Sequence, residues 1–401
     1  MPDRLTPQLA RAFAGNGIGV AARRVRIVAV VALLALTVAS CAQATGSNRS
    51  AVTVSSTTVS PALVRPEANV HLRRLAAGER PPQFVLFSFD GVGVSPNWDL
   101  FLGTAQKSGA RFTALMTGLY FLTTQARGKY HGPGHLPGEA AIGFGGAKAE
   151  VIEQIEYLNR TYDAGHEMGT HYVGHFCRGD RYPGSRWTTA DWNAELDQFF
   201  SLMRDWRANT GITTGPDLAF GPGEVRGGRT QCLEGTPAAL YPALRRHGFT
   251  WDSSIPAKQK GLGWPEKING IWEFAVPYAY SPPLGKAQTA LDYNFWYTVN
   301  RATNVPGDAP KIRQIVRESY RYMYDRAYAG NRAPLVIANH FNDWNNNAFN
   351  PATADFMAEV CARPQTVCAT HSDVVKWLEL QDSKVLRDLR RQPLAAVDAT
   401  Q

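Results

Sequence analysis

Short apolar runs that end at polar residues alternate with longer segments whose apolar residues recur every three or four positions. The first pattern predicts buried strands, and the second predicts amphipathic helices. The clearest run is FVLFSFD, residues 84–90, which ends at Asp90 and is typical of a strand covered on both faces. Further strands are expected at residues 111–117, 165–171, 217–223, 248–254, 334–340 and 367–371, and helices at residues 97–107, 149–164, 189–209, 237–247, 310–328, 352–361 and 372–380. This alternation predicts an α/β fold with a parallel sheet and helices outside it.

The N-terminus has the pattern of an export signal. Arg23, Arg24 and Arg26 precede an apolar run at residues 27–39. The motif VASC at residues 38–41 overlaps the end of this run and finishes at Cys41. The run is short for a membrane span but fits the hydrophobic region of a signal peptide. Small residues directly before Cys41 resemble the lipobox of bacterial lipoproteins, in which that cysteine is lipidated after cleavage. An ordinary signal peptide cut nearby is the alternative, and either interpretation predicts export. The lipobox interpretation adds membrane attachment at the outer face of the cell membrane.

The chain divides into four predicted segments. Residues 1–40 form the signal peptide, and residues 41–80, rich in Ser, Thr, Ala and Pro, are expected to be a flexible tether. The folded domain is expected at residues 81–385, with a tail at residues 386–401. Within the domain, residues 256–308 are rich in Gly, Pro and aromatic residues and indicate a loop-and-hairpin insertion near the site.

Composition supports an ordinary globular protein. The 401 residues are 44% hydrophobic and 19% charged, which is enough for one large core or two ordinary ones. The formal net charge is +8, and removal of residues 1–40 takes away five arginines and one aspartate, which leaves +4. No basic run and no interleaving of basic and aromatic residues indicates a nucleic-acid groove, so we expect no nucleic-acid partner.

Four cysteines follow Cys41, namely Cys177, Cys232, Cys361 and Cys368. An even number in an oxidising compartment favours disulfides over zinc thiolates. We expect Cys361 to pair with its near neighbour Cys368, and Cys177 with Cys232, although four cysteines allow other connectivities.

The segment GHEMGTHYVGH carries the strongest local signal for chemistry. It places His171 and His175 four residues apart, so a helical turn after Thr170 would put both imidazoles on one face, where they can bind the same divalent metal. The alternative is a pair of hydrogen-bonded core histidines. His166 and Glu167 do not form a zinc-protease motif, because Thr170 stands where that motif has its second histidine.

Five segments in order resemble the motifs of polysaccharide deacetylases with a NodB homology domain, and in detail the chitin deacetylase-like branch. They are SFDGVG, GHEMGTHYVGH, GPGEVRGGRTQ, FTWDSSI and ANHFNDW, and the resemblance extends from about residue 83 to residue 380. It implies a distorted (β/α) barrel with an irregular number of strands and a groove at the C-terminal ends of the strands.

The chemistry of that family explains these residue types. A divalent metal, with zinc as the expected ion, polarises the acyl carbonyl and acidifies a water molecule, while a carboxylate takes the proton of the water. A histidine protonates the departing amine, which is a poor leaving group without an acid. The resemblance implies that His171 and His175 are metal ligands, that His340 is the acid, and that Asp90 is catalytic.

The sequence departs from the family pattern at two places. Gly91 stands where the family has a second aspartate, so Asp90 is either the base or the third metal ligand, and the attraction of a divalent metal for the nearest carboxylate favours the ligand role. Phe220 and its neighbours stand where the family has an arginine that orients the base. Glu224 or Arg226 are the candidate substitutes from the same loop.

Aromatic residues near these motifs suggest a carbohydrate surface, since sugar rings stack on aromatic faces. Trp251, Asp252 and Trp344 are predicted to contact the substrate, with Asp252 also interpretable as an orienting residue at a strand end. The sequence thus predicts an exported deacetylase of N-acetylated or O-acetylated cell-wall or extracellular polysaccharide. The alternatives are a catalytically inactive relative that binds glycan and a hydrolase of a non-sugar amide.

Overall fold

The computed structural model describes residues 65–76 and 78–400. The predicted signal peptide and the lipidation site Cys41 lie outside these residues. Within the described ranges, none of the helices combines the length and the apolar character that a membrane crossing requires.

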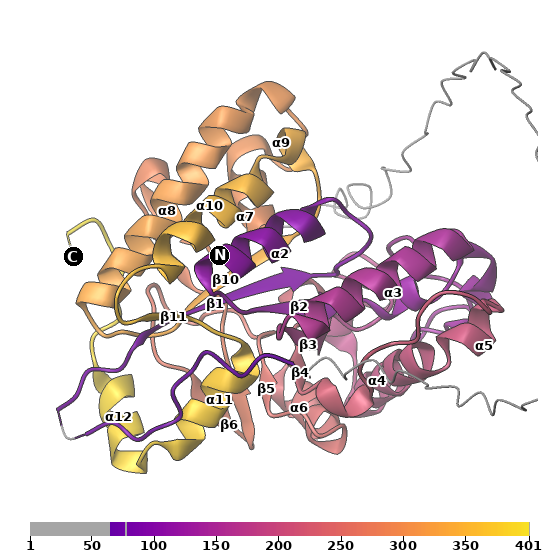
Figure 1. Ribbon diagram of the computed structural model, residues 1–401, viewed down its shortest axis with the longest axis horizontal. Helices are drawn as coiled ribbons and strands as arrows, with labels where there is room; N and C mark the ends of the chain where they lie inside the picture. Colours follow the sequence, from indigo (N-terminus) through magenta and orange to yellow (C-terminus); the bar gives the residue numbers. More distant parts are fainter. Residues whose placement is uncertain (1–64, 77, 401) are drawn as a thin grey trace, which may run out of the picture. The chain divides into compact units, whose positions relative to one another are not determined.

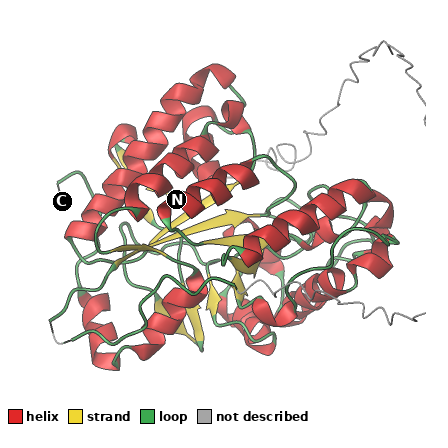
Figure 2. Ribbon diagram, in the orientation of Figure 1, coloured by secondary structure: helices red, strands yellow, loops and turns green. Residues whose placement is uncertain are grey.

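A curled sheet forms the centre of the domain, with helices around it (Figure 2). Its strands pair in parallel except for one antiparallel hairpin, β6 with β7. The described strands do not close the barrel, since no pairing joins β10 to β6. In spatial order the strands are β10 (Leu335–His340), β1 (Gln83–Asp90), β2 (Phe112–Met116), β3 (Glu167–Thr170), β4 (Gly227–Gly228), β5 (Trp251–Asp252), β7 (Ile271–Glu273) and β6 (Glu266–Ile268), and β11 (Thr366–Cys368) also pairs with β1. The predicted α/β fold with a distorted barrel is confirmed.

Helices cover the outside of the sheet (Figure 1). The predicted helix at residues 189–209 is two helices, because the chain leaves helical geometry at Asp205. The helices are α2 (Asn97–Ser108), α3 (Lys148–Asp163), α4 (Thr189–Arg204), α5 (Trp206–Thr210), α6 (Pro237–Arg246), α7 (Asp292–Asn300), α8 (Ala309–Ala329), α9 (Trp344–Asn347), α10 (Phe349–Cys361), α11 (His371–Leu380) and α12 (Ser383–Arg391).

Strand β1 shows how the hydrophobic pattern positions the site. All eight of its residues are buried, and β10 pairs with it on one side and β2 and β11 on the other. Its register with β10 makes Asp90 the direct neighbour of His340. Two polar residues far apart in sequence therefore meet at the C-terminal edge of the sheet, where barrels of this class build their sites.

The strand predicted at residues 217–223 is wrong, and the pairing strand is Gly227–Gly228. A Cβ on Gly228 would come within 2.4 Å of the Thr170 carbonyl oxygen, and one on Gly227 within 2.2 Å of the Trp251 ring. The position thus needs glycine for close approach, and glycine contributes nothing to a hydrophobic pattern.

The folded domain also extends beyond both of its predicted boundaries, residues 81 and 385. On the N-terminal side, Val70 is buried, and the Asn69 side chain donates a hydrogen bond to the Cys368 carbonyl oxygen at 2.8 Å. On the C-terminal side, Ala396 is buried and accepts a hydrogen bond from the Tyr280 amide at 2.8 Å. Part of the predicted tether and of the predicted tail therefore belongs to the domain.

The insertion at residues 256–308 contains two hairpins followed by helix α7. The first is β6 with β7, and the second is β8 (Tyr278–Ser281) with β9 (Lys286–Thr289). After β9 the chain lies against β10, where the Ala338 amide donates to the Ala290 carbonyl oxygen at 3.0 Å. This contact places the start of α7 beside the end of β10.

Both predicted disulfides are present, Cys177–Cys232 and Cys361–Cys368. The second closes a short local loop between α10 and β11. The first joins the loop after β3 to the loop after β4, so it lies at the C-terminal edge of the sheet.

Candidate active site

Four of the residues predicted from the motifs line one cavity of about 350 Å³ at the C-terminal ends of the strands. They are Asp90, His171, His175 and His340. The rest of the lining comes from the loops after β3 and β4 and from the insertion, and it consists of Cys177, Arg178, Thr230, Cys232, Leu233, Glu234, Leu291, Tyr293 and Asn294.

Asp90 forms a buried ion pair with Arg229. The Arg229 Nη1 donates to the Asp90 Oδ1 at 2.6 Å, and the two side chains are 1% and 3% exposed. Ser253 holds the guanidinium by accepting hydrogen bonds at its carbonyl oxygen (3.1 Å) and its Oγ (2.8 Å). Burial alone would raise the pKa of Asp90, but the Arg229 charge, aided by His171 and His340, outweighs burial and lowers this pKa. Asp90 is therefore ionised, and its hydrogen bond from Arg229 fixes the orientation of its carboxylate.

Arg229 is the cation that orients Asp90, a role for which the motif at Phe220 offers no arginine. The suggested substitutes, Glu224 and Arg226, are exposed and line a different cavity, at the N-terminal ends of β3 to β5. Strand β4 separates the two positions: Arg226 precedes it, whereas Arg229 follows it and reaches the opposite edge of the sheet. The expectation that Glu224 or Arg226 orients Asp90 is therefore wrong.

The predicted helical turn around His171 and His175 is also wrong. The chain leaves β3 in an irregular loop in which Tyr172 and His175 have φ values of 57° and 58°. The loop wraps around the buried carboxylate of Glu195 on α4, which accepts hydrogen bonds from the Val173 amide at 3.0 Å and the Gly174 amide at 2.8 Å. This loop still brings the two imidazoles together, with ring centroids 5.5 Å apart.

Both imidazoles are neutral near pH 7. Burial lowers the pKa of His171 to about 4 and that of His175 to about 3. The His171 Nδ1 lies 2.8 Å from the Arg229 carbonyl oxygen, so Nδ1 carries the hydrogen and Nε2 keeps its lone pair. A histidine held in this way is arranged as metal-binding histidines usually are.

His340 is paired with Asp292, a residue that the sequence interpretation did not identify. The His340 Nδ1 lies 2.7 Å from the Asp292 Oδ1, and the His340 amide donates to Oδ2 at 2.7 Å. Burial alone would lower the pKa of His340, but the charge of Asp292 and its hydrogen bond raise it. The sequence signal for Asp292 is an acidic residue opening a helix, which equally indicates stabilisation by the helix dipole.

Trp251 does not reach the cavity, so its predicted contact with substrate is wrong. Its side chain is fully buried, stacks on His371 and donates to the Glu167 Oε1 at 2.9 Å. Trp251 belongs to the interior of the barrel and not to the cavity that Asp90 lines.

Asp252 has the orienting role that was its alternative interpretation. It is fully buried, and burial raises its pKa to about 6. It accepts a hydrogen bond from the Ser254 Oγ at 2.6 Å, and that oxygen in turn accepts one from the Thr230 amide at 2.9 Å. The side chain thus holds the loop after β4 and does not face a substrate.

Trp344 lies beside His340 and is not among the residues that line the cavity, so the cavity does not bear out its predicted contact with substrate. It is 5% exposed, stacks on Trp296 with ring centroids 4.5 Å apart, and lies 5.3 Å from the His340 ring. The aromatic residue on the cavity wall is instead Tyr293, on helix α7.

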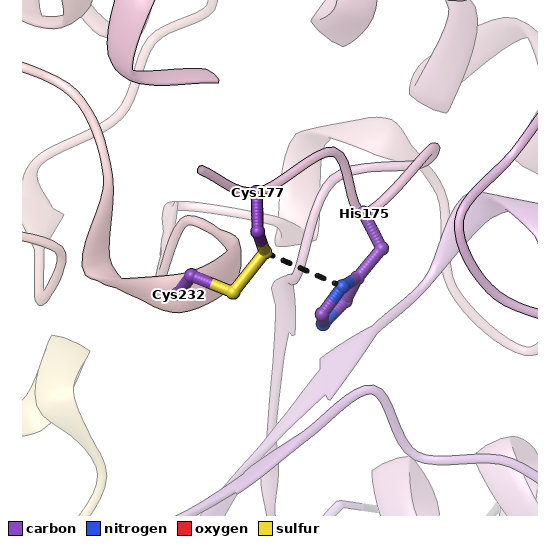
Figure 3. A group of neighbouring side chains, drawn as sticks. All are labelled: His175, Cys177 and Cys232. Carbon is purple, nitrogen blue, oxygen red and sulfur yellow. Dashed lines mark hydrogen bonds between the residues drawn. A yellow bond between two sulfur atoms is a disulfide. The ribbon is translucent and has the colours of Figure 1, made fainter. Parts of the chain in front are cut away.

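The donor types in the cavity, imidazole and carboxylate, are ones that divalent cations bind, but the ligand atoms of Asp90, His171 and His175 do not all lie within 4.8 Å of one another. Two neutral imidazoles, His171 and His175, face the cavity together with one ionised carboxylate, Asp90, which already balances the charge of Arg229. In the described ranges, one group of three potential ligands has its atoms within 4.8 Å of one another, namely His175, Cys177 and Cys232 (Figure 3). Its two sulfur atoms form a disulfide and are therefore not thiolate ligands.

No protein-family model and no curated protein sequence matches this chain. Solved structures that are similar include a protein from Mycobacterium smegmatis assigned to the polysaccharide deacetylases, with 15% identity, a TM-score of 0.46, and coverage of 81% of this chain and 98% of that one. A family 4 carbohydrate esterase from Streptomyces lividans, in complex with acetate, shows 12% identity, a TM-score of 0.37, and coverage of 73% and 94%. A mutant of a CE4 family pseudoenzyme with restored enzymatic activity shows 9% identity, a TM-score of 0.37, and coverage of 75% and 69%.

Proposed function

We propose that this protein is an exported, metal-dependent deacetylase that removes acetyl groups from N-acetylated or O-acetylated cell-wall or extracellular glycan. One observation carries the proposal: Asp90 paired with a cation and His340 paired with an anion face the same cavity. The two pairings shift the pKa values in opposite directions, which is the arrangement expected of a base and an acid that work together.

Asp90 acts as the base. The Arg229 guanidinium keeps it ionised and fixes one of its oxygens, so the carboxylate accepts a proton from water in a set direction. A divalent cation held by His171 and His175 would, when bound, polarise the acyl carbonyl and acidify that water. We therefore assign Asp90 as the base and not as the metal ligand that the sequence favoured, because Arg229 already balances the charge of its carboxylate.

His340 acts as the acid. Asp292 holds its ring through Nδ1 and raises its pKa, so the imidazolium form is kept to a higher pH than burial alone would allow. The proton goes from His340 to the departing amine of an N-acetyl group or the departing alkoxide of an O-acetyl group. An amide requires this proton more than an ester does, since an amine anion is the poorer leaving group.

The proposal of export rests on the arginine-flanked apolar run at residues 27–39 and on the VASC motif. A lipid on Cys41 would attach the protein to the outer face of the cell membrane. The domain would then act on glycan close to that surface.

A second candidate function is glycan binding without catalysis, and Gly91 favours it. Gly91 has a φ of 59°, and a Cβ added there would lie 3.2 Å from the Thr117 Oγ1 and 3.5 Å from the His171 Cδ2. A second carboxylate at this position would therefore lie beside His171. Without it, a cation has less negative charge to bind.

Metal analysis combined with acetate release tests the proposal. The purified protein should contain a divalent metal and release acetate from acetylated chito-oligosaccharides or O-acetylated glycans. His340→Ala should keep the metal but lower turnover by about 10² to 10⁴, whereas the double change of His171 and His175 to Ala should abolish both. His131→Ala, a change of an exposed histidine outside the cavity, is the matched control. Unchanged metal content in the double variant would contradict the proposed site, and glycan binding without acetate release would support the second candidate.

A further inference from the structure

A disulfide lies against one of the histidines of the cavity. Cys177 follows His175 by two residues in the loop after β3, and Cys232 lies in the loop after β4. The His175 Nδ1 is 3.7 Å from the Cys177 Sγ (Figure 3), and the ligand atoms of all three residues lie within 4.8 Å of one another.

We propose that reduction of this disulfide creates a second metal site, in which two cysteine thiolates and His175 bind Zn²⁺. A tetrahedral zinc site has Zn–S distances of about 2.3 Å and Zn–N distances of about 2.0–2.1 Å, so its sulfur–nitrogen edges measure about 3.6 Å. The distance from His175 to Cys177 already matches that edge. The two sulfur atoms would separate to about 3.8 Å by the same geometry. The fourth position is left for water.

The disulfide is accessible to a small dithiol. Cys232 is exposed, whereas Cys177 is 7% exposed. A dithiol thiolate would attack the Cys232 sulfur, which breaks the disulfide and releases the Cys177 thiolate. The second thiol of the reagent then attacks the mixed disulfide, so the reagent leaves as a cyclic disulfide and the protein gains two electrons. Each cysteine thiol gives its proton to solvent when it binds the metal.

Other contacts keep the two loops together after the disulfide opens. The carboxylate of Glu234, two residues after Cys232, accepts hydrogen bonds from the Arg178 amide at 2.6 Å and the Ser185 amide at 2.7 Å. On the other loop, the Asp180 Oδ2 accepts one from the Cys177 amide at 2.6 Å. These bonds cross between the loops or fix their ends without involving sulfur. The ligands therefore stay near one another in the reduced protein.

Occupation of this site would remove His175 from the catalytic cavity. That consequence alone rests on the proposed function, because a neutral imidazole has one nitrogen lone pair, so a neutral His175 bound to the thiolate zinc could not also bind the deacetylase metal. Reduction in the presence of zinc would then inhibit the enzyme, while binding itself is independent of any activity.

Cobalt binding tests the site directly, since Co²⁺ bound to thiolates shows a sulfur-to-metal charge-transfer band in the near ultraviolet. We would add Co²⁺, and then Zn²⁺ in competition, to the full chain before and after treatment with a dithiol and removal of the reagent. A Cys41→Ser background excludes that thiol. The band should be absent from the oxidised protein, appear after reduction and disappear when Zn²⁺ is added.

The chain offers a matched control in its second disulfide. The double change of Cys361 and Cys368 to Ala should leave the band intact, whereas the double change of Cys177 and Cys232 to Ser should abolish it and His175→Ala should weaken cobalt binding. Circular dichroism of the reduced protein checks that the fold persists. Absence of the band from folded, reduced protein would overturn the proposal, as would its persistence in the double Ser variant of Cys177 and Cys232.

Discussion

The buried pair between Arg229 and Asp90 should contribute strongly to stability as well as to chemistry. Arg229→Met keeps much of the side-chain volume but leaves the Asp90 carboxylate buried without its cation. Removal of one partner of a buried ion pair costs about 3–5 kcal/mol. The change also removes the two hydrogen bonds that Ser253 accepts from the guanidinium. We therefore expect the free energy of unfolding at pH 7 to fall by about 3–5 kcal/mol.

The effect of this substitution should depend on pH. In the wild-type protein the pKa of Asp90 is lowered, so its stabilising contribution is present above the ordinary aspartate pKa of about 3.9 and is lost as the pH falls through the lowered value. In Arg229→Met the largest remaining influence is burial, which raises the pKa of Asp90. The folded variant then takes up a proton at higher pH than the unfolded chain does. Its destabilisation relative to wild type should shrink as the pH is lowered from 7 towards 5.

Urea unfolding of a double-mutant cycle measures the interaction. Asp90→Asn alone should also destabilise the protein, and the double variant should be less destabilised than the sum of the two single variants. Arg246→Met is the matched control, because its pair with Asp197 is exposed and is worth less than about 1 kcal/mol. Additive effects, or a cost of Arg229→Met no larger than that of the control, would refute the reasoning.

Three further predictions concern the proposed acid His340, the second carboxylate that is absent at Gly91, and the predicted lipidation site Cys41. Asp292→Asn should move the basic limb of the kcat/KM against pH profile to lower pH, because the lowering of the His340 pKa by burial is then opposed mainly by the charge of Asp90 alone; an unchanged limb would contradict the assigned pair. Gly91→Asp puts a side chain at a φ of 59°, which costs some stability, but in folded protein it should raise metal content and acetate release by adding a carboxylate beside His171; no gain in either in protein shown to be folded by circular dichroism would mean that this carboxylate is not limiting. Cys41→Ala should move the protein into the soluble cell fraction with its fold intact, and a variant that is still processed and remains on the membrane would rule out the lipobox.

Local sequence patterns determined the elements and the residues that end them. The run FVLFSFD predicted a strand that ends at Asp90, and PLVIANH predicted one that ends at His340, because burial on both faces of a parallel sheet demands continuous apolar residues. The order of five motifs then placed Asp90, His171, His175 and His340 in one site before any geometry was known. Those four residues do line one cavity.

The partners of these residues depended on tertiary structure. Arg229 was overlooked because β4 is two glycines with no hydrophobic signal, so nothing in the pattern indicated on which side of a strand each cation would lie. Asp292 reaches His340 only because the insertion returns along β10, a contact between segments 48 residues apart. Likewise, the loop that joins His171 to His175 takes its shape from a carboxylate on the following helix. Sequence periodicity reports which face of an element is buried, whereas the charge that lies opposite a given side chain is decided by how distant elements pack.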